Sequence, residues 1–329
     1  MRIAGAVLGL LLLLAGCTSS GDSGDSDEPR AEPGDRCRGV SHDEVRGRAP
    51  SYGAKRLRSY PVDHAVCAAY WIDHADDGFV PQGLALRGRT AYVGGYGWVE
   101  KRTDRACQVA KVDLRTGRTT GFTPRIEADV YGGRLTFCRH GGGLELTDDG
   151  LWLAEAERLW LLDPDRIGRG DPVVRVWRIE PGIKGSTLLI HDGRLGFATY
   201  AAEGSGRMTW FALDDVRRPG VDDLRHDARD ATDAGVTGRG RVPNRVQGIT
   251  GDAAGVWHSS SRISCGELHG PGRREVASVP GAEDVQFRGR DLWVVSEAGA
   301  EPWIDEERVP MLLRLDRATV LRARSACDF

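Results

Sequence analysis

A short hairpin pattern recurs five times along the chain, and it constrains the fold more than any other feature. Each copy has two runs of alternating apolar and polar residues joined by a Gly or Asp turn, and its two core positions lie seven residues apart. The core pairs are Leu84 and Ala91, Leu144 and Leu151, Leu188 and Leu195, Ile249 and Val256, and Val285 and Leu292. Alternation with period two predicts half-buried strands, and such a turn between two of them predicts a hairpin. The chain is therefore expected to be all-β.

Each hairpin is followed by further alternating runs, so the repeating unit is larger than the hairpin. In the most regular unit, the hairpin at 144–154 is followed by runs at 159–163 and 173–179, with Gly, Asp or Pro turns between them. The units recur at intervals of 60, 44, 61 and 36 residues, which is typical of propeller blades with loop insertions. Radial stacking covers the faces of such sheets and leaves only short edges. We predict a β-propeller of four-stranded antiparallel blades.

Three stretches need separate interpretation. Five blades are detectable, and Tyr131–Phe137 resembles a worn hairpin that would belong to a sixth. The run Val62–Ile72 has many β-branched and aromatic residues but no partner nearby, so we expect it to close the ring as the outer strand of the last blade. The polar insertion at 215–245 interrupts the rhythm, and we interpret it as a surface loop or a disordered flap.

The first residues predict export. A positive start, an apolar run and a small-residue cleavage site make a secretory signal, shorter than the roughly 20 residues of a membrane span. The tetrapeptide Leu14-Ala15-Gly16-Cys17 resembles the bacterial lipobox, whose cysteine becomes the lipidated first residue of the mature chain. We expect a lipoprotein signal peptide at 1–16, lipidated Cys17 with a disordered tether at 17–36, and a single propeller domain at 37–329.

These features predict a compartment and one partner. A lipid on Cys17 would anchor the protein to the outer face of the bacterial cell membrane, and the propeller would be extracytoplasmic. The formal net charge of −3 argues against a nucleic-acid surface, which needs a concentrated basic stripe. Any small-molecule or protein partner is left unidentified.

The cysteine count supports export. The chain has seven cysteines, and setting aside Cys17 leaves six, which in an exported protein suggests up to three disulfides. Cys107 and Cys138 flank the same unit and are the first expected pair. Cys67 and Cys327 are the second, as a staple between the two ends of the ring. No Cys-x-x-Cys pair is present, which argues against a structural zinc site.

The repeat resembles a known group of propellers. Its cues are Gly-Leu-x-Leu before the turn, Leu-Trp-Val after it, and Leu-Asp at the end of the third strand, and they extend over Val80–Asp316. These cues are similar to those of the NHL-like, quinoprotein-like and gluconolactonase/strictosidine-synthase-like propellers. The resemblance implies a propeller with an axial site. Functions in that group range from sugar-lactone and phosphotriester hydrolysis to protein scaffolding, so the resemblance leaves the activity open.

The inner strands of a propeller begin near its axis, so the residues just before each first strand should converge there. In register these are Gln82, Gly142, Ser186, Gln247 and Glu283. With Asp284 and His140, the polar members form a candidate ligand-binding ring. They can equally be interpreted as groups that satisfy strand ends or bind channel water, and both interpretations stay open.

A metal site is the second hypothesis for this end of the axis. Loops after the second strands should open on the same face, and they contribute Glu155 and Glu297. Together with Glu283 and Asp284 these carboxylates are candidate ligands for Ca²⁺ or another divalent cation. The metal sites implied by the lactonase-type resemblance also use Asn, whereas the single Asn of this chain, Asn244, lies outside the register.

Two functions follow, and no catalytic residue is identified for either. The first is a membrane-tethered, extracytoplasmic propeller that binds a ligand or a protein through its axial pole. The alternative is a metal-dependent lactone or ester hydrolase with its site in the central channel. The segment His140–Gly143 resembles an esterase oxyanion segment, but the Gly-x-Ser-x-Gly elbow is missing, so whether the protein is an enzyme stays open.

Overall fold

The computed structural model describes residues 37–130, 133–183, 185, 187–304, 307–325 and 327–329. The predicted signal peptide, the tether and Cys17 lie outside the described residues. No helix in the described part of the chain is long and apolar enough to cross a membrane.

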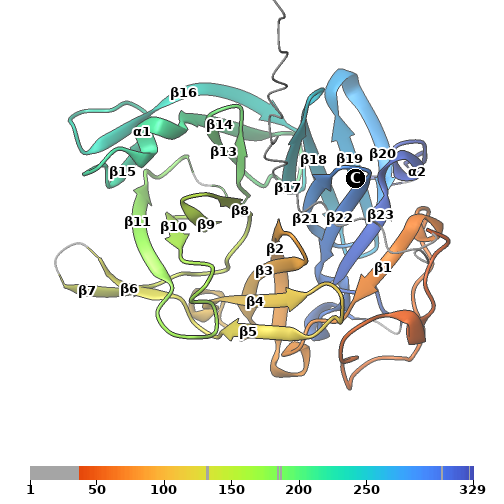
Figure 1. Cartoon of the computed structure of the whole chain (residues 1–329). Helices are drawn as coiled ribbons and strands as arrows, with labels where there is room; N and C mark the ends of the chain where they lie inside the picture. Colours follow the sequence, from red (N-terminus) through yellow and green to blue (C-terminus); the bar gives the residue numbers. More distant parts are fainter. Residues whose placement is uncertain (1–36, 131–132, 184, 186, 305–306, 326) are drawn as a thin grey trace, which may run out of the picture.

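Five four-stranded units form a ring around one axis (Figure 1). Blade 1 contains β2 (Phe79–Arg87), β3 (Thr90–Gly97), β4 (Cys107–Asp113) and β5 (Thr119–Thr123). Blade 2 contains β8 (Leu144–Thr147), β9 (Gly150–Ala154), β10 (Arg158–Leu162) and β11 (Val173–Ile179). Blade 3 contains β12 (Leu189–His191), β13 (Arg194–Ala198), β14 (Gly206–Ala212) and β16 (Asp233–Val242).

Blade 4 contains β17 (Val246–Asp252), β18 (Gly255–Arg262), β19 (Cys265–Gly270) and β20 (Arg274–Ser278). Blade 5 contains β21 (Ala282–Arg288), β22 (Asp291–Ser296), β23 (Leu312–Asp316) and β1 (Val66–Tyr70). The first strand of each blade is innermost, and each inner strand contacts the inner strands of both neighbouring blades. The predicted propeller of four-stranded antiparallel blades is confirmed.

Helical segments are short and lie between strands or at the ends of the described chain. The α-helices are α1 (Leu213–Arg217) and α2 (Arg317–Val320). The 3-10 turns are η1 (His42–Glu44), η2 (Asp63–Ala65), η3 (Ala75–Asp77), η4 (Arg102–Asp104), η5 (Pro271–Arg273), η6 (Glu297–Gly299) and η7 (Glu301–Trp303).

The ring is closed by the N-terminal strand, as predicted. β1 pairs antiparallel with β23, with Ala69 opposite Leu313, and completes the sheet order β1-β23-β22-β21. All five residues of β1 are buried. The closing blade is therefore built from strands at opposite ends of the chain.

Tryptophans at one hairpin position pack blades 2, 4 and 5 against the blade that follows each in the ring. Trp152 is fully buried with Leu188 and Leu195 of blade 3, and it stacks on Trp177 with ring centroids 5.2 Å apart. Trp257 belongs to the cluster of Val285 and Leu292 in blade 5. The apolar alternation that identified the repeat is therefore the packing between blades.

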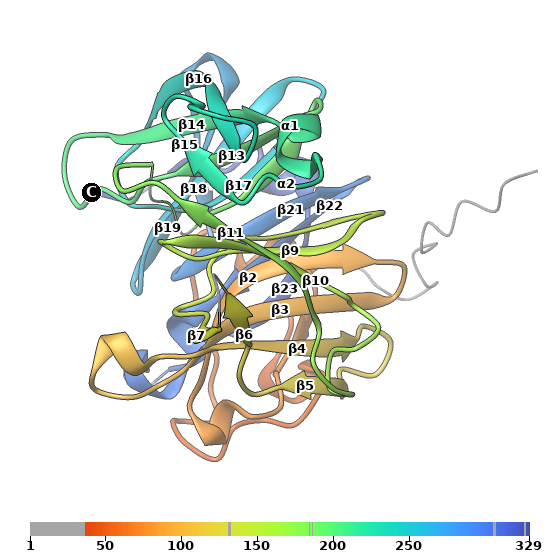
Figure 2. The same cartoon turned by 90° about the vertical axis from the view of Figure 1, so that its left-hand side faces the viewer.

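The polar insertion at 215–245 is neither a loop nor a flap, which corrects the sequence interpretation. β16 is the outer strand of blade 3, and β15 (Asp223–Arg225) pairs in parallel with both β11 and β16. Blades 2 and 3 thereby share one nine-stranded sheet. Figure 2 shows β11, β15 and β16 side by side on the face turned towards the reader.

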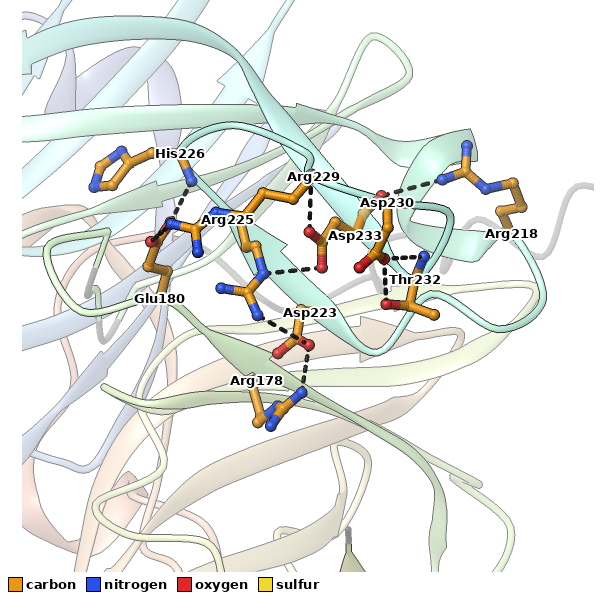
Figure 3. A network of polar contacts seen from close by, with 10 residues as sticks. All are labelled: Arg178, Glu180, Arg218, Asp223, Arg225, His226, Arg229, Asp230, Thr232 and Asp233. Atoms are coloured by element: carbon orange, nitrogen blue, oxygen red, sulfur yellow. Dashed lines mark hydrogen bonds and ion pairs between the residues drawn. The ribbon is translucent and has the colours of Figure 1, made fainter.

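Charge pairs add to the buried apolar contacts of Leu224 and Ala234 at this junction (Figure 3). Asp233 is 2% exposed and accepts from the Nε atom of Arg225 and the backbone amide of Arg229, both at 2.9 Å. Asp223 is bonded to Arg178 of β11. These strands were missed because β15 has only three residues and because Gly238 and Gly240 interrupt the apolar alternation of β16.

The suspected sixth blade is a hairpin. β6 (Glu127–Val130) pairs with β7 (Arg134–Phe137), and among the described residues these two strands form a sheet of their own. Figure 1 shows this hairpin projecting from the ring. Within the described chain, the four-stranded units therefore number five.

Three disulfides are present, and one predicted pair is correct. Cys107 is bonded to Cys138, as expected. The pair Cys67 with Cys327 is wrong, because the structure joins Cys37 to Cys67 and Cys265 to Cys327. Gly39 is hydrogen-bonded to Val66, which brings Cys37 alongside β1. Arg324 forms a bridge with Val276, which places the C-terminal tail on blade 4 instead of blade 5.

Candidate functional site

Three inner strands carry a β-bulge at the same repeat position. The register of β2, β17 and β21 shifts at Gln82, Gln247 and Glu283, respectively. A bulge leaves its extra residue outside the ladder and re-aims the side chain. The predicted members of the ring are thus directed towards the axis by the same local irregularity in three blades.

The bulged side chains join a hydrogen-bonded chain at one end of the axis. Gln82 donates from Nε2 to Glu297 Oε2 at 2.9 Å, and Gln247 donates from Nε2 to Glu283 Oε1 at 2.8 Å. The carboxyl groups of Glu283 and Glu297 are hydrogen-bonded to each other. The order is Gln247–Glu283–Glu297–Gln82, which we call the carboxyl chain.

The end of β22 positions Glu297. Ser296 is the last residue of that strand, and its Oγ accepts a hydrogen bond from the amide of Ala298 at 3.2 Å. The same hydroxyl donates to the carbonyl of Pro280 at 2.7 Å. This cap starts the turn η6, so Glu297 leaves the blade directly beside Glu283.

The two carboxyl groups share a proton. Burial raises the pKa of Glu283 well above its usual range, and the neighbouring Glu297 raises it further. Burial also raises the pKa of Glu297, to about 7, although hydrogen bonds from Gln82 and Glu283 oppose the rise. Because two carboxylates in contact cannot both be ionised at low cost, Glu283 holds the proton and donates to Glu297.

Asp284 lies at the axis and connects four blades. Its carboxylate accepts the amide N–H of Val285 and that of Leu84, both at 2.9 Å, and that of Leu144 at 3.5 Å. Ile249 donates a further backbone hydrogen bond. All four donors are the first core residues of their repeats. Burial raises the pKa of Asp284, and these N–H groups oppose that rise.

Three of the other four blades carry glycine at this level of the axis, and blade 3 carries the buried Thr187. Gly83, Gly143 and Gly248 occupy the position that Asp284 occupies in blade 5. A Cβ at Gly83 would collide with the carbonyl oxygen of Gly142, and one at Gly248 would lie 2.6 Å from Asp284 Cα. Asp284 is thus a structural group that satisfies inner-edge amides, whereas Glu283 beside it belongs to the carboxyl chain.

Aromatic and cationic groups surround this end of the axis. Tyr96 stacks on His140 with centroids 4.5 Å apart, and the Arg105 guanidinium lies 3.8 Å from the centre of the Trp98 ring. Trp98 meets Trp303 edge to face at 5.3 Å. Burial, with help from nearby arginines, lowers the pKa of His140 to about 4, so its ring is neutral at pH 7.

Sequence reasoning missed Arg105 and Trp303. Both lie in connections between strands, so no repeat position marks them: Arg105 follows the turn η4, and Trp303 is the last residue of η7. Burial raises the pKa of Tyr96, and Glu297 raises it further, which places the phenol near the carboxyl chain. These residues form the rim of the site.

The candidate metal ligands do not assemble. Glu155 is 1% exposed, but it accepts from the amide of Arg139 at 2.7 Å and pairs with Arg158 at 2.5 Å. In the described part of the chain, no three His, Cys, Asp or Glu side chains are placed to hold a metal ion. The arrangement therefore does not fit a Ca²⁺ site built from Glu155, Glu283, Asp284 and Glu297. Ser186 lies outside the described residues.

The antiparallel blades, the closing strand and the polar end of the axis define a β-propeller protein. No family model and no curated protein matches the sequence. The PQQ-bound aldose sugar dehydrogenase from Streptomyces coelicolor has a similar fold, with 16% identity, a TM-score of 0.40, and coverage of 82% of this chain and 99% of that one.

Two other propellers show similar levels of likeness. BamB from Moraxella catarrhalis has 13% identity and a TM-score of 0.29, covering 71% of this chain and 59% of that one. The WD40 domain of Neurospora crassa Pan2 has 9% identity and a TM-score of 0.36, covering 76% and 65%. These similarities concern the fold alone, and the narrower resemblance to NHL-like and gluconolactonase-like propellers stays a prediction.

Proposed function

We propose that this protein is a membrane-tethered, extracytoplasmic propeller that binds a polar ligand at the end of the axis where the carboxyl chain lies. The observation that carries the proposal is the carboxyl chain itself. Three separate blades use the same bulge position to direct amide and carboxyl groups to one place. A scaffold that needed only strand pairing would have no reason to interrupt three inner ladders at the same position.

The carboxyl chain suits a ligand that has both hydrogen-bond donors and hydrogen-bond acceptors. Glu283 and Glu297 share a proton, so the pair offers one O–H donor and several acceptor lone pairs. Each glutamine donates through Nε2, and no described residue donates to Oε1 of Gln82 or Gln247. Trp98 and Trp303 add aromatic surface at the rim. Hydroxyl or amide groups of a small molecule or of a protein loop would match these partners.

The tether belongs to the same proposal. Disulfides persist in oxidising compartments, so the three pairs support export. We expect the mature chain to begin with diacylglyceryl Cys17, and intact-mass spectrometry should find that modification. A Cys17→Ser variant should leave the membrane fraction, and a variant that stays there would contradict the anchor.

Ligand binding can be tested with a panel of polar small molecules in a thermal-shift assay, followed by calorimetry of the hits. A ligand of the axial site should bind the native chain and bind at least about tenfold more weakly to Glu283→Ala, because alanine removes both the donor to Glu297 and the acceptor of Gln247. Glu203→Ala is the matched control, since Glu203 is exposed on the loop after β13. Equal affinity in both variants would exclude this site.

The alternative function, a metal-dependent lactone or ester hydrolase, would give different results. Metal analysis of the purified chain would find a stoichiometric divalent ion that is lost in Gln247→Ala or Glu283→Ala. Lactone or ester hydrolysis would fall with the metal. That pair of results would overturn the binding proposal in favour of the enzyme.

A further inference from the structure

A second polar cavity lies at the other end of the axis, beyond Asp284. The inner strands run from the bulges past the Asp284 level towards their hairpin turns, and there they surround a cavity of about 200 Å³. It is lined by residues that follow the first core position in each inner strand. Asp284 and its amide donors separate this cavity from the carboxyl chain.

Three oxygen acceptors from three blades face this cavity. Glu145 of β8, Thr250 of β17 and Gln286 of β21 are the residues directly after their core positions, and all three line it. Glu145 Oε1 accepts the amide of Ile190 at 3.4 Å, and Thr250 Oγ1 accepts that of Phe287 at 3.3 Å. Gln286 makes no side-chain hydrogen bond to any described residue. Each side chain thus keeps an oxygen lone pair for a ligand.

A glycine makes room for a fourth polar group, His191. The position two residues after the core residue is Leu86 in blade 1 and Phe287 in blade 5, but Gly251 in blade 4. A Cβ at Gly251 would lie 2.7 Å from His191 Nδ1, so only glycine permits the imidazole to reach the cavity. His191 Nε2 lies 3.3 Å from Asp192 Oδ2, which orients the ring.

The charges around the cavity favour a cation. Among the described residues, neither Lys nor Arg lines it. Burial raises the pKa of Glu145 well above its usual range, and the neighbouring Asp284 raises it further. A positive group that enters the cavity would offset both effects and stabilise the ionised carboxylate.

We propose that this cavity binds the primary ammonium group of a small amine. An ammonium group has three N–H donors, and Glu145, Thr250 and Gln286 supply three acceptors around it. The apolar side chains of Leu86 and Phe287 line the remaining wall and would contact a short alkyl stem. A water takes about 30 Å³ of liquid volume, so the cavity accommodates an amine with only a few carbon atoms. This site is independent of the carboxyl chain and of its proposed ligand.

Calorimetric titration of the full-length chain with methylammonium chloride at constant ionic strength tests the proposal. Saturable one-site binding is expected for the native protein, and the affinity should fall at least about tenfold in Glu145→Gln. Asp148→Asn is the matched control, because Asp148 is exposed in the turn of the same hairpin and does not line the cavity. Tetramethylammonium, which lacks N–H donors, should not compete.

A second variant covers the case in which Glu145→Gln does not fold. Gln286→Ala removes one acceptor and should weaken methylammonium binding several-fold, with an unchanged circular dichroism spectrum. No saturable binding to the native chain, equal binding of tetramethylammonium, or unchanged affinity in the folded variants would each overturn the proposal.

Discussion

At the scale of single residues, the neighbouring acidic side chains of Glu283 and Asp284 have different roles. Asp284 is surrounded by backbone donors from four blades, so its carboxylate completes the hydrogen bonding of the inner strands. Glu283, one residue earlier, has a carboxyl partner and an amide donor in place of backbone N–H groups. Position relative to the bulge therefore decides whether a side chain completes the hydrogen bonding of the inner strands or joins the carboxyl chain.

Asp284→Ala should reduce the free energy of unfolding by at least about 3 kcal/mol, because buried amides that lose their acceptor each cost about 1–3 kcal/mol. Urea denaturation measures the loss. Asp284→Asn keeps one oxygen acceptor and should lose less. An alanine variant within about 0.5 kcal/mol of the native protein would show that water replaces the carboxylate.

Glu297 should make stability fall as pH rises. Its pKa is about 7 in the folded protein and 4.5 without the fold, so the folded state binds more protons between these values. The slope of unfolding free energy against pH is then negative across that window, and the stabilising contribution is complete only below about pH 4.5. The Glu297→Gln variant should have a more positive slope than the native protein between pH 4.5 and 7. Parallel curves would contradict the shared proton.

At the scale of elements, the strands of the repeat can be recognised in the sequence wherever apolar side chains alternate. The hairpins around Leu144 and Val285 were found because their buried face is apolar, and the closing strand β1 was found for the same reason. β16 was not recognised because Gly238 and Gly240 interrupt its apolar alternation. A pattern of acidic and basic residues is typical of a loop unless their partners are known.

Asp233→Ala should loosen the junction between blades 2 and 3. The amide of Arg229 would lose its acceptor, and Arg225 would keep only its longer contact with Asp223. Hydrogen exchange should accelerate in β15 and β16 and stay slow in β17 and β18. The exposed Asp230 allows a control: Asp230→Ala, which removes only two local bonds from Thr232, should leave β15 protected. Uniform protection in both variants would contradict this role.

At the scale of the whole molecule, the ring is closed by strands from both ends of the chain. β1 pairs with β23, and the bond between Cys37 and Cys67 fixes the segment that precedes β1. The C-terminal tail is instead bonded to blade 4 through Cys265 and Cys327. Each terminal segment is thus fastened to a different blade, next to the strands that complete the ring.

Replacing Cys37 and Cys67 with serine should destabilise the protein by about 2–4 kcal/mol, since the bridge closes a loop with a sequence separation of 30 residues. Thermal unfolding measures this loss, and amide exchange in β1 and β23 should increase most. The corresponding change at Cys107 and Cys138 should affect β6 and β7 instead. Peptide mapping that joined Cys67 to Cys327 would refute the pairing on which this prediction depends.

The sequence by itself determined the propeller, its closure and the register of the carboxyl chain. These are local properties, because the alternation of side chains reports which face of a strand is buried, and Gln82, Gln247 and Glu283 share one place in that pattern. Only the tertiary structure decided what those side chains meet. The bond between Gln82 and Glu297 joins residues 215 positions apart, and the disulfide partners and the β15–β16 junction likewise depend on distant segments. A repeat identifies equivalent positions, but each polar contact depends on the one neighbour that the closed ring brings to it.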